Sequence, residues 1–368
     1  MRVTGAVLER SGAERPYSAS RPLVVEDIEL EAPGASEVLI RVEAAGVCHS
    51  DLSVVNGDRP RPLPMLLGHE AAGVVEAVGD DVHDLRPGDA VVASFLPRCG
   101  SCPECATDGR VPCRNGSAAN GAGELLGGGR RLTRRGEPIA HHLGVSGFAT
   151  HAVLHRSSLV AVGDGVPADV AALMGCAVLT GGGAIVNVVR PLAGQRVIVV
   201  GLGGVGMAGL LTALAHDGVE VVGVDAAPAK LEAALALGAH AVYSPADAIA
   251  AGINGDGVLE AAGSARAFET ALALTAIGGA MVTVGLPHPD ARAAVSPLDL
   301  VAGARTITGS YLGSAVPARD IPRFVEWWRN GRLPVERLIS SSVPLAQINE
   351  AMDELSEGRA TRQIITMG

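Results

Sequence analysis

The chain has 368 residues, of which 48% are hydrophobic, and it carries a formal net charge of −10. This length fits two domains of ordinary size, and so high an apolar fraction excludes a disordered chain. The acidity excludes nucleic acid and anionic membrane as main partners, because both select basic surfaces. The N-terminal residues show no signal sequence, so we expect a cytoplasmic protein whose six cysteines are not a disulfide framework.

The first part of the chain, about 175 residues, has the pattern of short β-strands. Runs such as 37–48 and 71–79 are short and apolar-rich and are bounded by Gly and Pro, as is typical of antiparallel strands joined by tight turns. Residues 114–140 are Gly-rich, polar and locally basic, and we expect a long surface loop there. Its arginines are expected to form a solvated face; they are Arg130, Arg131, Arg134 and Arg135.

Two cysteines and a histidine suggest a catalytic metal site. Cys48 stands in GVCHSD, and His69 and Glu70 follow in LGHEAAGVVEAVG. Thiolates from Cys48 and Cys176 and the His69 imidazole would leave the fourth position of a zinc ion open for substrate. Alone, either cysteine would more often be a buried, inert thiol, so the prediction depends on the whole set.

The segment 94–113 reads SFLPRCGSCPECATDGRVPC and holds four of the six cysteines. Thiolates at this spacing, in a loop rich in Gly and Pro, can turn inward on one tetrahedral zinc and leave no position open. A bacterial iron–sulfur motif would place the last cysteine after three residues and before Pro, whereas seven residues intervene here and Arg114 follows. A nucleic-acid-binding zinc ribbon would need a basic surround. We therefore predict a structural zinc on Cys99, Cys102, Cys105 and Cys113.

After Pro167, short β-branched runs alternate with helical patterns, which predicts βαβ units in a parallel, doubly wound sheet. Residues 197–215 hold no charge over nearly the length of a membrane span. Their glycines separate a β-branched run from a Leu/Ala run, which favours a strand, a turn and a helix. Two amphipathic helices are expected around 318–331 and 345–358, with the Trp327–Trp328 pair used for packing.

The stretch RVIVVGLGGVG places Gly201, Gly203 and Gly206 in a G-x-G-x-x-G motif after a strand and at the start of a helix. There the glycines let the backbone approach a pyrophosphate, which the helix N-terminus binds. Asp225 ends the next strand, nineteen residues after Gly206. An acid at this place accepts from the ribose 2′-OH and repels a 2′-phosphate, and no arginine adjoins it. NAD is therefore predicted over NADP.

Together these motifs resemble the zinc-containing, medium-chain alcohol dehydrogenases, in the long-loop, animal-type branch that includes class III. The resemblance covers essentially the whole chain and also rests on GCAVLTGGGAIVN and RATRQIITM. It implies an α/β fold with a GroES-like, β-rich catalytic domain of residues 1–177 and 316–368, which carries a structural zinc lobe at 95–113. Residues 178–315 would form a doubly wound, NAD-binding Rossmann domain, with the active site between the two domains.

The resemblance also implies roles for single residues. Ser50 would hydrogen-bond the alcohol and begin the proton path, and His49 would face the pyrophosphate. Asp51 would orient the ligand His69, and Glu70 would lie next to the metal. Thr180 and Val205 would border the nicotinamide, and Arg362 would also lie near Asp51. Lys230 would bind the cofactor or, alternatively, be an ordinary exposed lysine. The full set of cofactor residues would be Thr180, Gly201, Gly203, Gly204, Val205, Gly206, Asp225, Lys230, Val284 and Arg362.

Two departures from the family pattern bear on chemistry. Ser53 stands where many members carry the histidine that completes the proton relay, so the relay would end through water, the cofactor ribose or His49. Glutathione-dependent formaldehyde dehydrogenases bind their thiol adduct with an arginine at the position of Ser117, which disfavours that substrate, although Arg130 or Arg131 would remain for another thiol. The pocket wall would comprise Phe95, His142, Leu143 and Leu286.

This wall indicates a medium-chain or aryl alcohol. His142 would either hydrogen-bond a polar substituent or face the surface, and His141 is expected to face the surface. We predict a zinc-dependent dehydrogenase or aldehyde reductase that transfers hydride between a primary alcohol and NAD, with one catalytic and one structural zinc per chain. The alternatives are a nicotinoprotein that retains its NAD, a thiol-adduct formaldehyde dehydrogenase, and a non-catalytic zinc scaffold. A homodimer is expected, with a tetramer left open.

Overall fold

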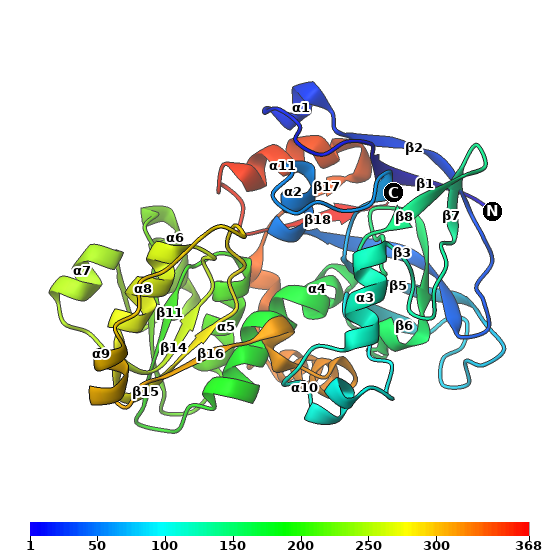
Figure 1. Cartoon of the computed structure of the whole chain (residues 1–368). Coiled ribbons are helices and arrows are strands. Elements are labelled where there is room, and N and C mark those ends of the chain that lie inside the picture. The colour runs from blue at the N-terminus through cyan, green and yellow to red at the C-terminus, as the bar shows by residue number, and fades with distance from the viewer. Residues whose placement is uncertain (368) are drawn as a thin grey trace. The chain divides into compact units, whose positions relative to one another are not determined.

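The computed structural model describes residues 1–367 and divides the chain into two compact units (Figure 1). The first unit joins Met1–Cys176 to the C-terminal segment from Ile339 onward, and the second unit is Ala177–Leu338. The predicted α/β class is confirmed, because the first unit is mainly antiparallel and the second contains a parallel sheet.

The chain returns to the first unit later than the predicted residue 316. Helix α10 (Pro317–Arg329) belongs to the second unit. Its Phe324 is fully buried, and its Trp327 ring meets His216 of the same unit edge-on, with centroids 5.6 Å apart. The predicted boundary therefore differs from the structure because the apolar face of α10 completes the second unit's core before the chain crosses back.

A closed barrel forms one layer of the first unit. Its strands β1 and β2 pair antiparallel from Arg2↔Glu29 to Leu8↔Leu23, and their inward side chains fill an aliphatic core. In barrel order the strands are β1 (Arg2–Leu8), β2 (Leu23–Leu30), β7 (Leu132–Arg134), β8 (Glu137–His141) and β4 (Met65–Leu66).

The second sheet of this unit is organised around its long strand β3 (Glu37–Val47), which pairs with β5, β9 and β18. Because β18 comes from the chain's C-terminal segment, the sheet ties both ends of the chain into one unit. Its other strands are β10 (Leu159–Ala161), β6 (Ala90–Ala93), β5 (Glu70–Val78), β18 (Arg362–Thr366), β17 (Ile339–Pro344) and β9 (His151–His155).

Residues 114–140 do not form the expected loop. Helix α3 (Arg114–Ala122) begins where the Gly116 N–H donates to the Cys113 thiol, and β7 and β8 follow. The expected solvated arginine face is also wrong in part, since Arg131 pairs with Glu37 and Arg134 with glutamates of the barrel. The remaining helices of this unit are α1 (Tyr17–Ser20), α2 (His49–Val55), α4 (Ala168–Leu173), α11 (Ile348–Ser356), η1 (Pro103–Thr107), η2 (Arg156–Ser158) and η7 (Leu345–Gln347).

The second unit is a parallel sheet with the strand order β13-β12-β11-β14-β15-β16, the doubly wound order of dinucleotide-binding folds. Helices lie along this sheet in Figure 1. Its strands are β11 (Arg196–Val200), β12 (Glu220–Val224), β13 (Ala241–Tyr243), β14 (Gly255–Glu260), β15 (Thr275–Thr283) and β16 (Thr306–Gly309). Its further helices are η4 (Ala184–Val189), α5 (Gly204–Leu214), α6 (Pro228–Leu237), α7 (Pro245–Ala250), α8 (Ala265–Ala273), α9 (Pro297–Ala302), η5 (Tyr311–Ser314) and η6 (Val335–Leu338).

The uncharged stretch 197–215 forms strand β11, a turn and helix α5, as predicted. Among the described residues, the one helical stretch long and apolar enough to span a membrane is Ala168–Val189, and 72% of its apolar 18-residue window is buried inside the protein. Burial of this kind is typical of the core helix of a soluble protein, and it favours that interpretation here.

Candidate active site and metal centres

Strand pairing brings Cys48 and His69 together. Cys48 follows the end of β3 and caps the N-terminus of α2, while His69 directly precedes β5. The register Gly46↔Glu70 between these antiparallel strands aligns the two segments. Both side chains are buried, with Cys48 7% and His69 0% exposed.

Cys176 reaches the same place from a distant part of the sequence. It lies in a π-helical stretch, η3 (Met174–Gly182), which continues α4, and its thiol lies 3.5 Å from Nε2 of His69. One ligand atom from each of Cys48, His69, Glu70 and Cys176 lies within 4.8 Å of the others. The hydrogen bond from Cys176 holds the pKa of the Cys48 thiol well below its ordinary value, even though burial opposes ionisation. The charge of Arg362 lowers this pKa as well.

Glu70 and Arg362 form a buried ion pair beside these donors, with Nη1 of Arg362 2.9 Å from Oε1. Gly46 makes room for the carboxylate, because a Cβ on it would lie 2.3 Å from Glu70 Oε2. Burial raises the pKa of Glu70 to about 7 despite the guanidinium. Arg362, predicted at the cofactor and near Asp51, is thus bound to Glu70, and Oε2 of Glu70 has no hydrogen-bond partner among the described residues.

Asp51 supports the histidine from behind. Its Oδ1 lies 3.1 Å from Nδ1 of His69, and its Oδ2 accepts the Cys48 N–H at 3.2 Å. Although burial raises it, the adjacent His69 and the side chain of His142 bring the pKa of Asp51 down to about 2. An ionised Asp51 keeps the Nδ1 proton on His69 and leaves Nε2 free to bind a metal.

These residues fit a zinc ion well. Two thiolates and an imidazole nitrogen are donors that zinc prefers, and three such ligands with an open position are typical of catalytic sites. Glu70 also lies beside this donor group, with its Oε1 3.9 Å from Nε2 of His69. The arrangement can therefore hold a zinc ion and leave one position for a substrate oxygen.

The four-cysteine lobe forms a second cluster. Its thiols lie within 4.8 Å of one another, with 3.5 Å between Cys102 and Cys105 and 3.8 Å between Cys102 and Cys113. Sulfurs bonded to one tetrahedral zinc at about 2.3 Å would be about 3.8 Å apart, whereas a disulfide needs about 2.05 Å. The Cys99 and Gly116 N–H groups both donate to Cys113, as suits a thiolate. This cluster fits a closed zinc site.

The predicted pocket residues divide between the units. In the first unit, Phe95 meets the His69 ring edge-on with centroids 5.5 Å apart, and the Asn120 side chain fixes it by donating to its carbonyl at 2.7 Å. Leu143 is buried, and its backbone has the left-handed conformation. Leu286 belongs to the second unit and is 52% exposed.

Both histidines expected near the surface are buried. His142 is 1% exposed, and its Nδ1 lies 3.1 Å from Asp51 Oδ1. His141 is also 1% exposed and accepts the Arg131 N–H at 3.0 Å. The surface interpretation of each was wrong, and sequence reasoning missed the link from His142 to Asp51. A polar pair within the apolar run IAHHLGV was the available signal.

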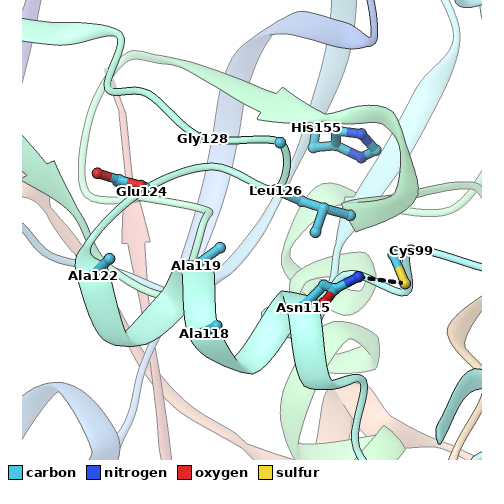
Figure 2. A pocket seen from close by; sticks show the side chains of 10 residues that line it. Cys99, Asn115, Ala118, Ala119, Ala122, Glu124, Leu126, Gly128 and His155 are labelled. Atoms are coloured by element: carbon cyan, nitrogen blue, oxygen red, sulfur yellow. Dashed lines mark hydrogen bonds between the residues drawn. The ribbon is translucent and has the colours of Figure 1, made fainter. Parts of the chain in front are cut away.

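A hollow of about 610 Å³ lies against α3 and the four-cysteine lobe (Figure 2). Its wall shares no residue with the Cys48 site. The wall offers few functional groups, because α3 contributes mainly small side chains and residues 127 and 128 are glycines. In Figure 2, Asn115 is directed toward Cys99, to which it donates at 3.3 Å. This hollow is therefore not the predicted substrate pocket.

In the second unit, the three motif glycines meet different needs. Gly201 has φ +92°, and a Cβ on Gly206 would lie 1.8 Å from the Gly201 carbonyl. A Cβ on Gly203 would have nothing within 4 Å, so the backbone there is open to a ligand. Gly203 caps α5, which begins at Gly204. A tight turn, an open approach and close helix packing are the features that hold a pyrophosphate.

Asp225 follows β12 and lies next to the glycine turn, because its carboxylate accepts the Leu202 N–H at 2.7 Å. Lys230 is half-buried and its Nζ is 3.9 Å from Asp225, so it is not an ordinary exposed lysine. Thr180 and Val284 are each 9% exposed, and Val205 lies in the first turn of α5. In the first unit, Ser50 is half-buried and His49 exposed on the first turn of α2.

Comparison with known proteins agrees with this geometry. Residues 34–164 match the alcohol dehydrogenase GroES-like domain, and residues 204–330 match the zinc-binding dehydrogenase domain. Geraniol dehydrogenase of Castellaniella defragrans is 38% identical over 354 residues, 94% of each chain. Alcohol dehydrogenase class-3 of Drosophila melanogaster is 34% identical over 362 residues, 95% of each chain. The chain belongs to the zinc-containing alcohol dehydrogenase family.

Solved structures of this family superpose on the whole chain. Benzyl alcohol dehydrogenase of Acinetobacter calcoaceticus has a TM-score of 0.91 at 30% identity and full coverage of both chains. An alcohol dehydrogenase zinc-binding domain protein of Burkholderia ambifaria has a TM-score of 0.93 at 34% identity, covering 100% of this chain and 99% of that one. As a member of the zinc alcohol dehydrogenases, the chain is an oxidoreductase of alcohols that uses zinc and NAD.

Proposed function

We propose that this alcohol dehydrogenase interconverts primary alcohols of medium length or with an aryl group and their aldehydes. The observation that carries the proposal is the buried set Cys48, His69 and Cys176 with the Phe95 ring edge-on to His69. An aromatic wall beside a metal position suits a flat or apolar substituent on the carbon that reacts. Relatives named for geraniol and benzyl alcohol, both primary alcohols, support the same class.

When bound, zinc supplies a Lewis acid that lowers the pKa of an alcohol oxygen, and NAD supplies the hydride acceptor. We assign Cys48, His69 and Cys176 to the catalytic zinc, and the four lobe cysteines to the structural zinc. Ser50 would accept the alcohol proton and pass it on, and His49 would continue the path toward solvent, because Ser53 donates to the His49 carbonyl and offers no base. Catalysis needs both units, since one holds the metal ligands and the other the dinucleotide motif.

The thiol-adduct alternative loses its proposed anchors. Arg131 is held by Glu37, and Arg130 donates to the Ala122 and Gly123 carbonyls at the end of α3. Neither guanidinium is left as a dedicated site for a carboxylate of a thiol adduct. We therefore favour simple alcohols as substrates.

A substrate panel with NAD tests the proposal. We expect NADH formation with benzyl alcohol, geraniol and medium-chain primary alcohols, and little with hydroxymethyl-glutathione. Turnover on the glutathione adduct alone would overturn the substrate class. NAD released only by heat, with no turnover on added NAD, would favour a nicotinoprotein instead. An Asp225→Ser variant should lose preference for NAD over NADP by about tenfold or more.

We further propose a homodimer located in the cytoplasm. Strand β16 ends the parallel sheet, and apolar side chains near it are exposed: Ile277 80%, Leu298 74% and Val301 81%. A second copy would cover this apolar edge. Light scattering should give the mass of two chains, and a monomer would overturn the assembly. Cytoplasmic placement fits the cysteines, since all six lie within residues 1–367 and none forms a disulfide.

A further inference from the structure

Asp51 faces two histidines with a single oxygen. Its Oδ1 lies 3.1 Å from Nδ1 of His69 and also 3.1 Å from Nδ1 of His142, and it accepts the Gly68 N–H at 3.1 Å. All three side chains are buried, with none more than 1% exposed. A carboxylate behind a metal-binding histidine normally supports that imidazole, whereas here a second imidazole competes for the same oxygen.

The two histidines hold this oxygen differently. His69 makes the aligned hydrogen bond, while Nδ1 of His142 reaches the same distance without hydrogen-bond alignment. The His142 ring stands edge-on to His69, with centroids 5.4 Å apart at 86°. At this distance the His142 tautomer with its proton on Nδ1 is favoured, because an unprotonated Nδ1 would set its lone pair against those of Asp51 Oδ1, so the N–H dipole attracts the oxygen even without hydrogen-bond alignment. His142 therefore takes part of the carboxylate's charge without displacing His69.

The shared charge bears on the metal ligand. A carboxylate that accepts from Nδ1 makes Nε2 of the same imidazole a stronger donor to a metal. When a second N–H interacts with the same oxygen, the carboxylate increases the donor strength of His69 Nε2 by less. We propose that His142 is a positioning residue that weakens the hold of His69 on the catalytic zinc by sharing Asp51. The inference rests on the proposed ligation by Cys48, His69 and Cys176.

The test removes Nδ1 of His142 but keeps an aromatic ring at this position. In His142→Phe, Asp51 supports His69 alone, so the catalytic zinc should leave to a chelator about threefold to tenfold more slowly than from the wild type. In His142→Asn, the amide nitrogen replaces Nδ1, and release should return to nearly the wild-type rate. A merely structural role for His142 predicts the opposite sign, since loosened packing speeds release.

Zinc release is measured on the intact enzyme with a metal-sensitive dye, and the catalytic phase is identified as the one that Cys48→Ser lacks. Equal or faster release from His142→Phe, or slow release from His142→Asn, would overturn the role of His142. A wild-type protein with no catalytic phase would overturn the zinc assignment as well. With cobalt in the catalytic site, the visible bands should shift in His142→Phe and return in His142→Asn, and unchanged bands would also overturn the proposal.

Discussion

The two cysteine clusters of the first unit bring sulfur donors together in opposite ways. The lobe cluster comes from residues 99–113, and three of its four cysteines are only half-buried. The Cys48 cluster is fully buried and depends on segments 107 residues apart, as the contact between His69 and Cys176 shows. A cluster formed by local turns can make a closed structural metal site. A cluster formed by strand pairing places its donors among buried charges and leaves one metal coordination position for substrate.

Removing a donor from the buried cluster should have the largest effect. Cys48→Ser keeps the shape of the side chain but removes a thiolate, so kcat/KM should fall by about 10³-fold or more. Metal analysis should show zinc falling from about two ions per chain to about one. Full activity in this variant would refute the catalytic role of the cluster.

The matched change in the lobe should act on stability first. Cys102→Ser opens a closed site whose metal contributes to folding, and we expect a loss of about 4 kcal/mol or more in unfolding free energy. Denaturant unfolding measures this loss, and kcat of the remaining folded enzyme should change little. If kcat fell as steeply as in Cys48→Ser while stability held, the contrast between the clusters would be wrong.

The charges beside each cluster offer a smaller test. Arg362→Met leaves Glu70 buried without its partner and should cost about 3 kcal/mol of unfolding free energy at pH 8. The cost should shrink at pH 6, because burial raises the pKa of Glu70 to about 7 even beside Arg362, and loss of Arg362 raises that pKa further, so at pH 6 the carboxyl is mostly protonated in both proteins. Arg114→Met, which breaks the exposed pair with Glu104 beside the lobe, is the control and should scarcely change stability.

The smallest effect per pH unit separates zinc loss in acid from protonation of the protein. Burial lowers the pKa of His141 to about 3, against about 6.5 in the unfolded chain. Between these values the unfolded state binds the extra proton, so stability should fall as pH drops below 6.5, by about 1.4 kcal/mol per unit. His141→Gln retains an acceptor for the Arg131 N–H and should flatten this slope in zinc-saturated buffer. An equal slope in both proteins would assign acid sensitivity to the metal clusters.

Motifs with short spacing predicted much of this molecule. The glycines from Gly201 to Gly206 and the lobe cysteines carry their geometry in a few neighbouring residues, so their spacing is informative by itself. The contact of Arg362 with Glu70 joins residues 292 positions apart, and only the pairing of β18 with β3 determines it. The family pattern placed Arg362 in the right region, but which carboxylate it binds depends on side-chain packing.

Residues 114–140 show a second reason for error. Their glycines and arginines predicted a loop because the local helix and strand propensity is poor. However, Cys113 caps the start of α3, and Asn120 of this helix donates to the Phe95 carbonyl. Two of the arginines, Arg131 and Arg134, are paired with glutamates more than 90 positions away along the chain. Tertiary contacts thus outweigh local preference, and no pattern within the segment reports them.

Gly46 limits how this sequence can drift over evolutionary time. It stands after Ala44 and Ala45 in a strand, where exchange of glycine for alanine would ordinarily rank among the mildest changes. A single methyl group there would meet the Glu70 carboxylate at 2.3 Å and force a buried, charged side chain out of the donor group. An alanine at position 46 is therefore accommodated only if Glu70 moves away from Arg362, and a library that treats the position as neutral would disturb this buried ion pair.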